Sequence, residues 1–160
     1  MESRAKLFGH PIHQILIVFP LGLLATSVIF DIIYLITENR RWSEIAFWMI
    51  AAGVIGGALA APFGWIDFLA IPQNTRAKTI GLLHGALNVV VLGLFVASWF
   101  LRRDFPSEPS VIALALSFAA FAIAGVSGWL GGELVDRLGI GVDDGAHVNA
   151  PSSLTHKTVG

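Results

Sequence analysis

Gly9-His10-Pro11-Ile12-His13, followed directly by Gln14-Ile-Leu-Ile-Val-Phe-Pro-Leu-Gly-Leu23, places two histidines at the start of a long apolar stretch. Proline is favoured at the first position of an α-helix, where its missing N–H leaves no hydrogen bond unmade. We therefore expect His10 to cap a helix that begins at Pro11, with His13 in the first turn. Side chains three residues apart share one side of a helix, so both imidazoles would point the same way.

The composition excludes an ordinary water-soluble domain. Of the 160 residues, 55% are hydrophobic and only 13% are charged, and the mean hydropathy is +0.74, whereas soluble domains carry about 25% charged residues. The net charge of −1 gives no basis for binding nucleic acid. The chain has no cysteine, which excludes disulfides, thiolate metal sites and covalent haem attachment. These properties indicate an integral membrane protein.

Four apolar runs each approach the roughly 20 residues that a helix needs to cross a bilayer. They cover about residues 11–36, 43–68, 79–101 and 110–135, and short polar segments separate them. Short connections force neighbouring helices to be antiparallel. The sequence therefore predicts an all-α, up-down-up-down transmembrane four-helix bundle over residues 1–142, followed by a polar tail at 143–160.

In this topology both termini lie on one side of the membrane. Lysines and arginines are slightly more frequent on that side than on the opposite one, where the arginines are Arg40, Arg41, Arg102 and Arg103. Because positive residues concentrate in cytoplasmic segments, the counts favour cytoplasmic termini by a small margin.

Seven histidine, asparagine and carboxylate residues in or next to the predicted helices gather near the face that carries the termini. They are His10, His13, Asp67, His84, Asn88, Glu133 and Asp136. Ionisable groups within a bilayer usually face the bundle interior, where they find partners. His13 and His84 each lie near the start of a helix, at similar depth, so we expect them to approach one another with Asp67 or Glu133 close by. Asp31 lies near the opposite face, where we expect a buried acceptor or an ion pair with Arg40 or Arg41.

A weak internal repeat relates the two halves of the chain. His13 precedes Phe63-Gly-Trp-Ile-Asp67 in the first half, and His84 precedes Ser127-Gly-Trp-Leu-Gly-Gly-Glu133 in the second. This order predicts two helical hairpins related by a pseudo-twofold axis along the membrane normal. Rows of small residues that include Gly57 and Gly128 favour close helix approach, so leucine at either position should destabilise the bundle.

Three segments resemble the bacterial membrane-protein family catalogued as domain of unknown function 2231. They are Gly9-His-Pro-Ile-His13, Phe19-Pro-Leu-Gly-Leu23 and Gly131-Gly-Glu-Leu-Val-Asp-Arg-Leu-Gly-Ile-Gly-Val142. The resemblance implies a multi-pass, four-helix protein of the bacterial inner membrane without a settled activity. Related proteins joined to redox domains favour electron transfer. Many members have histidine where this chain has Leu138, a departure that leaves His13 and His84 as the strongest pair.

Three classes of function remain open. A b-type haem would be bound by His84 with His13 or His10, beside small residues that make room for the macrocycle. Zinc or another divalent transition metal would use His13, His84, Asp67 and Glu133 as ligands or as groups that orient them. A non-catalytic scaffold subunit would use the cluster only to fix helix register.

We rank the haem-binding electron-transfer protein first, with a redox protein or a second copy of the chain as possible partners. Hydrolytic chemistry lacks support, because the sequence has neither a Gly-x-Ser-x-Gly elbow nor a His-Glu-x-x-His pair. Whether the protein is an enzyme is left open at this point.

Overall fold

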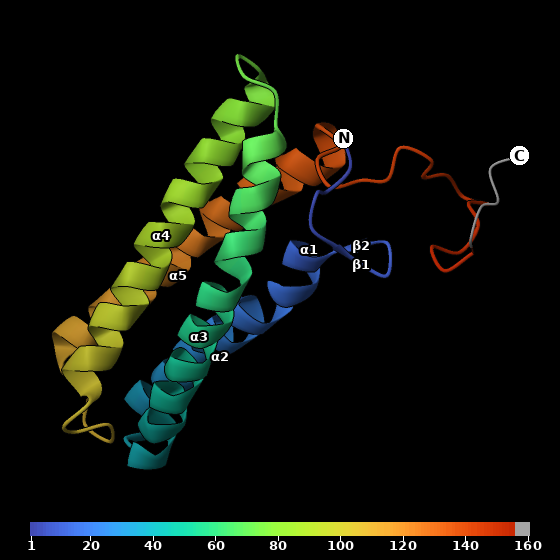
Figure 1. Cartoon of the computed structure of the whole chain (residues 1–160). Helices are drawn as coiled ribbons and strands as arrows, with labels where there is room; N and C mark the ends of the chain where they lie inside the picture. The colour runs from blue at the N-terminus through green and yellow to red at the C-terminus, as the bar shows by residue number, and fades with distance from the viewer. Residues whose placement is uncertain (156–160) are drawn as a thin grey trace, which may run out of the picture.

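The computed structural model describes residues 1–155, which form a bundle of four long helical segments (Figure 1). The elements are β1 (Lys6–Leu7), β2 (His10–Pro11), α1 (Ile12–Leu16), α2 (Val18–Thr37), α3 (Arg40–Ala70), α4 (Arg76–Arg102), α5 (Val111–Gly132) and the π-helical turn η1 (Glu133–Arg137). Four segments are long and apolar enough to cross a membrane: Ile12–Thr37, Arg40–Ala70, Arg76–Arg102 and Val111–Arg137. The predicted four-helix membrane bundle is confirmed.

The bundle consists of two helical hairpins, α2 with α3 and α4 with α5, joined side by side through α3 and α4 (Figure 1). A core of six buried residues fills the space between them, namely Leu24, Val28, Ile50, Val91, Phe95 and Ala120. The N-terminal amino group donates to the carbonyl oxygen of Gly139 at 3.0 Å. The N-terminus and the end of the last helical segment therefore meet at one face of the bundle, as the predicted topology requires.

Pro20 interrupts the first spanning segment. Proline has no N–H to donate to the carbonyl of Leu16, four residues earlier, and its ring crowds that carbonyl. The chain accordingly divides into α1 and α2 around Ile17. The hydrogen bonds from Ile17 N–H to the His13 carbonyl and from Leu21 N–H to the Ile17 carbonyl, at 3.0 and 3.1 Å, carry the helical path through the break.

Close helix packing occurs at some of the predicted glycines and not at others. A Cβ atom at Gly57 would lie 2.6 Å from Cδ2 of Leu92, so this glycine lets α3 and α4 approach. A Cβ atom at Gly128 would meet no atom within 4 Å. The expectation that a side chain at Gly128 would clash is wrong, because this residue faces outward from α5.

A buried ion pair joins the two hairpins at the end of the bundle opposite the termini. Arg102 at the end of α4 donates from Nη1 and Nη2 to the two carboxylate oxygens of Asp31 on α2, at 2.6 and 2.7 Å. Both side chains are 0% exposed. Arg102 also donates to Ser98 Oγ and Ser117 Oγ, each at 3.2 Å, so the network reaches α5 as well.

This ion pair corrects the prediction for Asp31. Asp31 is a buried acceptor, but its partner is neither Arg40 nor Arg41. Arg40 instead forms an ion pair with Glu108, outside the bundle core. Arg102 lies one helical turn after Ser98, on the face of α4 that packs inward, whereas the next residue, Arg103, points outward.

We expect single substitutions that break the buried pair to destabilise the protein strongly. Arg102→Met or Asp31→Leu alone leaves an unpaired charge in the core, which costs about 3–5 kcal/mol. The double variant should recover much of that loss, since no charge is left unpaired. Unfolding midpoints in mixed detergent and sodium dodecyl sulfate measure the effect, with the exposed Arg103→Met as the control. Single variants as stable as the control would contradict this role.

Replacing Gly57 or Gly128 by leucine should lower the unfolding midpoint by unequal amounts. Gly57→Leu inserts a side chain into an occupied contact with Leu92, and overpacking of this kind typically costs about 1–3 kcal/mol. Gly128→Leu enters open space and should leave the unfolding midpoint near that of the parent. Equal losses in both variants would show that Gly128 is covered in the protein.

Candidate functional site

His13 is fixed on α1 by a hydrogen bond to the backbone of α3. Its Nδ1 lies 3.0 Å from the carbonyl oxygen of Ala60. Because a carbonyl only accepts, the ring proton must lie on Nδ1, and Nε2 of the neutral ring keeps its lone pair. Gly64, one turn after Ala60, makes room for the ring, since a Cβ atom there would lie 2.7 Å from Cε1 of His13.

His84 on α4 is held in the same way by α5. Its Nδ1 lies 2.9 Å from the carbonyl oxygen of Ser127, and the Ser127 hydroxyl lies 3.2 Å from the same nitrogen. Gly131, one turn after Ser127, lies under the ring, where a Cβ atom would be 3.2 Å from Cε1. One feature differs from His13: Nδ2 of Asn88 lies 3.1 Å from Nε2 of His84, so the amide donates to the ring's remaining lone pair.

The matching contacts define how the two hairpins correspond. Ala60 and Gly64 in the first hairpin take the places of Ser127 and Gly131 in the second. This register is offset by three residues from the predicted match of Gly64-Trp65 with Gly128-Trp129. Gly131 lies under the ring of His84, whereas Gly128 faces outward.

Each histidine is bonded within its own hairpin, His13 to α3 and His84 to α5. Both rings are thus anchored through Nδ1 to a backbone carbonyl, one in each hairpin, and their approach to one another stays a prediction.

His10 does not join this pair. It lies in β2, is exposed, and its Nε2 is 3.3 Å from the hydroxyl of Ser153. The prediction that His10 caps the helix is wrong, because residues 6–11 form a β-hairpin. Pro11 is still extended, with φ −61° and ψ 121°, and the helix starts at Ile12.

The two predicted carboxylates bind other partners. Asp67 accepts from the Ser3 hydroxyl and from the backbone N–H of Arg4, and Glu133 forms an ion pair with Arg76 at 2.6 Å. Within residues 1–155, no group of three or more histidine, aspartate or glutamate side chains is arranged to hold a metal ion.

Sequence reasoning missed four residues of this site. Ala60 and Ser127 contribute backbone carbonyls, which leave no pattern in a sequence. Gly64 stood in a predicted row of small residues and Gly131 in the repeated segment Ser127–Glu133, but their facing histidines could be assigned only once the register of each hairpin was known.

Replacing Gly64 by alanine should displace the imidazole ring of His13. In an open helical position, Gly→Ala typically stabilises by up to about 1 kcal/mol. Gly64→Ala should instead lower the free energy of unfolding below that of the parent, since its methyl group overlaps the imidazole of His13. The outward-facing Gly125→Ala, where a Cβ meets nothing within 4 Å, is the matched control. A Gly64→Ala variant with a raised unfolding midpoint would show that the ring of His13 lies elsewhere.

Comparison with known proteins gives one match. A family model described as "Predicted membrane protein (DUF2231)" matches residues 9–144. No curated protein and no solved structure matches the chain. The matched range begins at Gly9, includes both anchored histidines and covers all four spanning segments. The chain therefore belongs to the DUF2231 family of predicted membrane proteins.

Proposed function

We propose that the protein binds a b-type haem between its two hairpins, with His13 and His84 as the axial ligands, and that it transfers electrons in the membrane. The observation that carries the proposal is the matched anchorage of the two rings, Nδ1 to carbonyl oxygen at 3.0 and 2.9 Å. Histidines that bind metals almost always donate the other ring N–H in this way, which fixes the ring and directs Nε2 to the metal.

The number of available ligands favours haem over a free metal ion. Haem iron needs only two ligands from the protein, whereas zinc sites take three or four. Asp67 would have to leave Ser3 and Arg4, and Glu133 would have to leave Arg76, before either carboxylate could complete a divalent metal site. His10, exposed on β2 and next to Ser153, has no part in the proposed site.

The arrangement also favours a ligand site over a purely structural role. The histidines bond within their hairpins, and the buried Asp31–Arg102 pair connects one hairpin to the other. Neither ring is therefore needed to hold the hairpins together. In the proposed complex the haem supplies one-electron redox chemistry. The chain's own residues bind it, orient the two rings and exclude water.

We place the protein in the bacterial inner membrane with its termini in the cytoplasm. The histidines lie in the half of the bundle nearer the termini, so a redox partner would approach from that side. A homodimer is compatible with the outward-facing glycines of α5, and the haem site as proposed does not require one.

Visible spectroscopy of protein purified in mild detergent, before and after reconstitution with haemin, tests the proposal. We expect an intense Soret band of a six-coordinate haem, which His13→Ala and His84→Ala should abolish or convert to a weaker five-coordinate spectrum. His10→Ala and His147→Ala are the controls and should retain the band. Stoichiometric zinc by elemental analysis with no Soret band after reconstitution would favour the metal site. Folded histidine variants with neither haem nor metal would favour the scaffold.

In the proposed complex the Asn88 amide would compete with haem for the lone pair of His84 Nε2. Asn88→Leu should therefore raise haem affinity by up to about tenfold, because a hydrogen bond contributes about 0.5–1.5 kcal/mol net. Ile17 has the equivalent place one turn after His13, so Ile17→Asn should lower the affinity by introducing the same competition. Titration of the haem-free protein with haemin measures both. Weaker binding by Asn88→Leu would contradict this role for the amide.

A further inference from the structure

The β-hairpin of residues 6–11 lies level with the last turn of a membrane-spanning helix. Ser3 Oγ donates to both carboxylate oxygens of Asp67 at 2.8 Å, and the backbone N–H of Arg4 donates to Oδ1 at 2.7 Å. The N–H of Ile12 donates to the carbonyl of Ala5 at 2.9 Å, which ties the hairpin to the start of α1. Asp67 precedes the end of α3 at Ala70 by about 4.5 Å along the helix axis.

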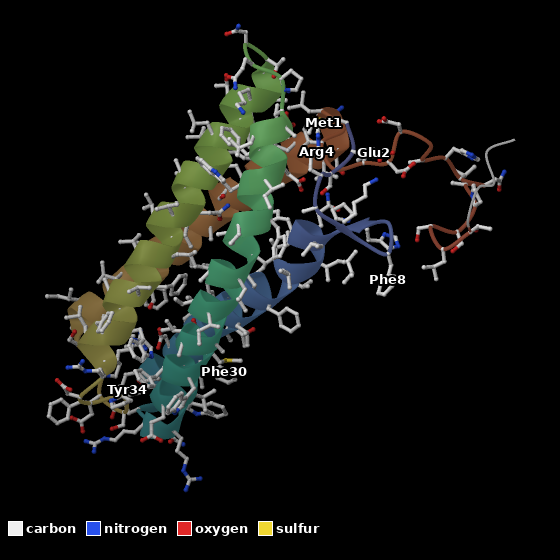
Figure 2. The ribbon with its side chains drawn as sticks, in the orientation of Figure 1. Met1, Glu2, Arg4, Phe8, Phe30 and Tyr34 are labelled. Carbon is white, nitrogen blue, oxygen red and sulfur yellow. The ribbon has the colours of Figure 1, made fainter. Side chains whose placement is uncertain are left out.

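Apolar side chains at this level face outward. Trp65 and Leu69 on the last turns of α3 are exposed, as expected for residues that contact lipid. Leu7 and Phe8 on the hairpin are exposed too, and Phe8 is 72% exposed. Figure 2 shows Phe8 at the tip of the hairpin, away from the helices.

The turn chemistry does not explain the aromatic side chain at the tip. Leu7 pairs with His10, so Phe8 and Gly9 form a two-residue turn, with φ of +50° and +84°. A turn with positive φ at both residues favours Asn-Gly or Asp-Gly, and a bulky residue at the first position is strained. Strain of this kind persists where the side chain serves another purpose. No core contact compensates for it, because the ring is mostly exposed.

We propose that this hairpin anchors the N-terminal segment to the bilayer, with Leu7 and Phe8 inserted into the interfacial region beside α1 and the end of α3. Aromatic rings are favoured at that depth. The segment Ser152–Leu154 lies beside the turn, where Ser153 is next to Gly9 and His10 and the segment lines a pocket together with Phe8. Phe8 nevertheless stays 72% exposed. The inference does not depend on the identity of the ligand at the histidines.

The absence of cysteine allows a clean test, because any introduced cysteine is the only one in the chain. Spin labels at Phe8→Cys, Val89→Cys and Val148→Cys would be compared in full-length protein in nanodiscs of phosphatidylcholine and phosphatidylglycerol. Val89 on a spanning helix is 72% exposed, which matches Phe8, and Val148 on the polar tail is 100% exposed. Collision rates with oxygen, which concentrates in lipid, and with a nickel chelate, which stays in water, report the surroundings of each label.

We expect the oxygen-to-nickel ratio at position 8 to lie close to that at position 89 and well above that at position 148. A ratio like that at position 148 would place the tip in water and overturn the anchor. Low collision rates with both reagents would show that protein covers the tip, either the tail or a second copy, and would overturn it equally.

A second measurement separates lipid contact from folding. Phe8→Asn installs the residue that the turn prefers, so it should leave the unfolding midpoint unchanged or raise it. In that background a label at Leu7→Cys should lose oxygen accessibility and gain nickel accessibility. A lowered unfolding midpoint, or an unchanged label at position 7, would show that Phe8 serves the fold instead.

Discussion

The ionisable side chains that this chain carries into the bilayer need partners inside the bundle, because hydrocarbon offers none. Asp31 and Arg102 meet this requirement through two hydrogen bonds to each other and further bonds to serines. His13 and His84 meet it through backbone carbonyls. The same constraint thus produces two unlike sites: an ion pair whose two charges bind each other, and two anchored rings, of which His84 also accepts from the Asn88 amide at Nε2.

The two sites lie at opposite ends of the bundle and have separate tasks. Along α4, Arg102 is 18 residues beyond His84, or about 27 Å at the rise of an α-helix. The ion pair connects the hairpins at one end, and the apolar core fills the middle. At the other end each histidine is supported only by its own hairpin. A ligand held by both rings would connect the hairpins there, where no buried ion pair among residues 1–155 does so.

The helices and their order were predictable from the sequence because lipid imposes a strong length and hydropathy requirement. The four spans agree with the predicted ranges to within a few residues, and His13 and His84 fall at the predicted face. The β-hairpin could not be predicted, because Phe8-Gly9 is an unusual turn pair and Pro11 fits the start of a helix as well as a strand. The partner of Asp31 could not be predicted from the sequence either. An arginine at a helix end usually extends to the membrane surface, and only the packing of α4 against α2 and α5 shows that Arg102 turns inward.

The central claim is that both histidines present Nε2 to one ligand between the hairpins. Nitrogen-15 NMR of protein labelled at histidine and embedded in lipid bilayers tests it most directly, before and after addition of haemin. We predict that His13 and His84 carry their protons on Nδ1 in the haem-free protein, and that haemin perturbs Nε2 of both rings while His10 and His147 stay unchanged. Protons on Nε2 in either ring, or a response to haemin confined to one of them, would contradict it.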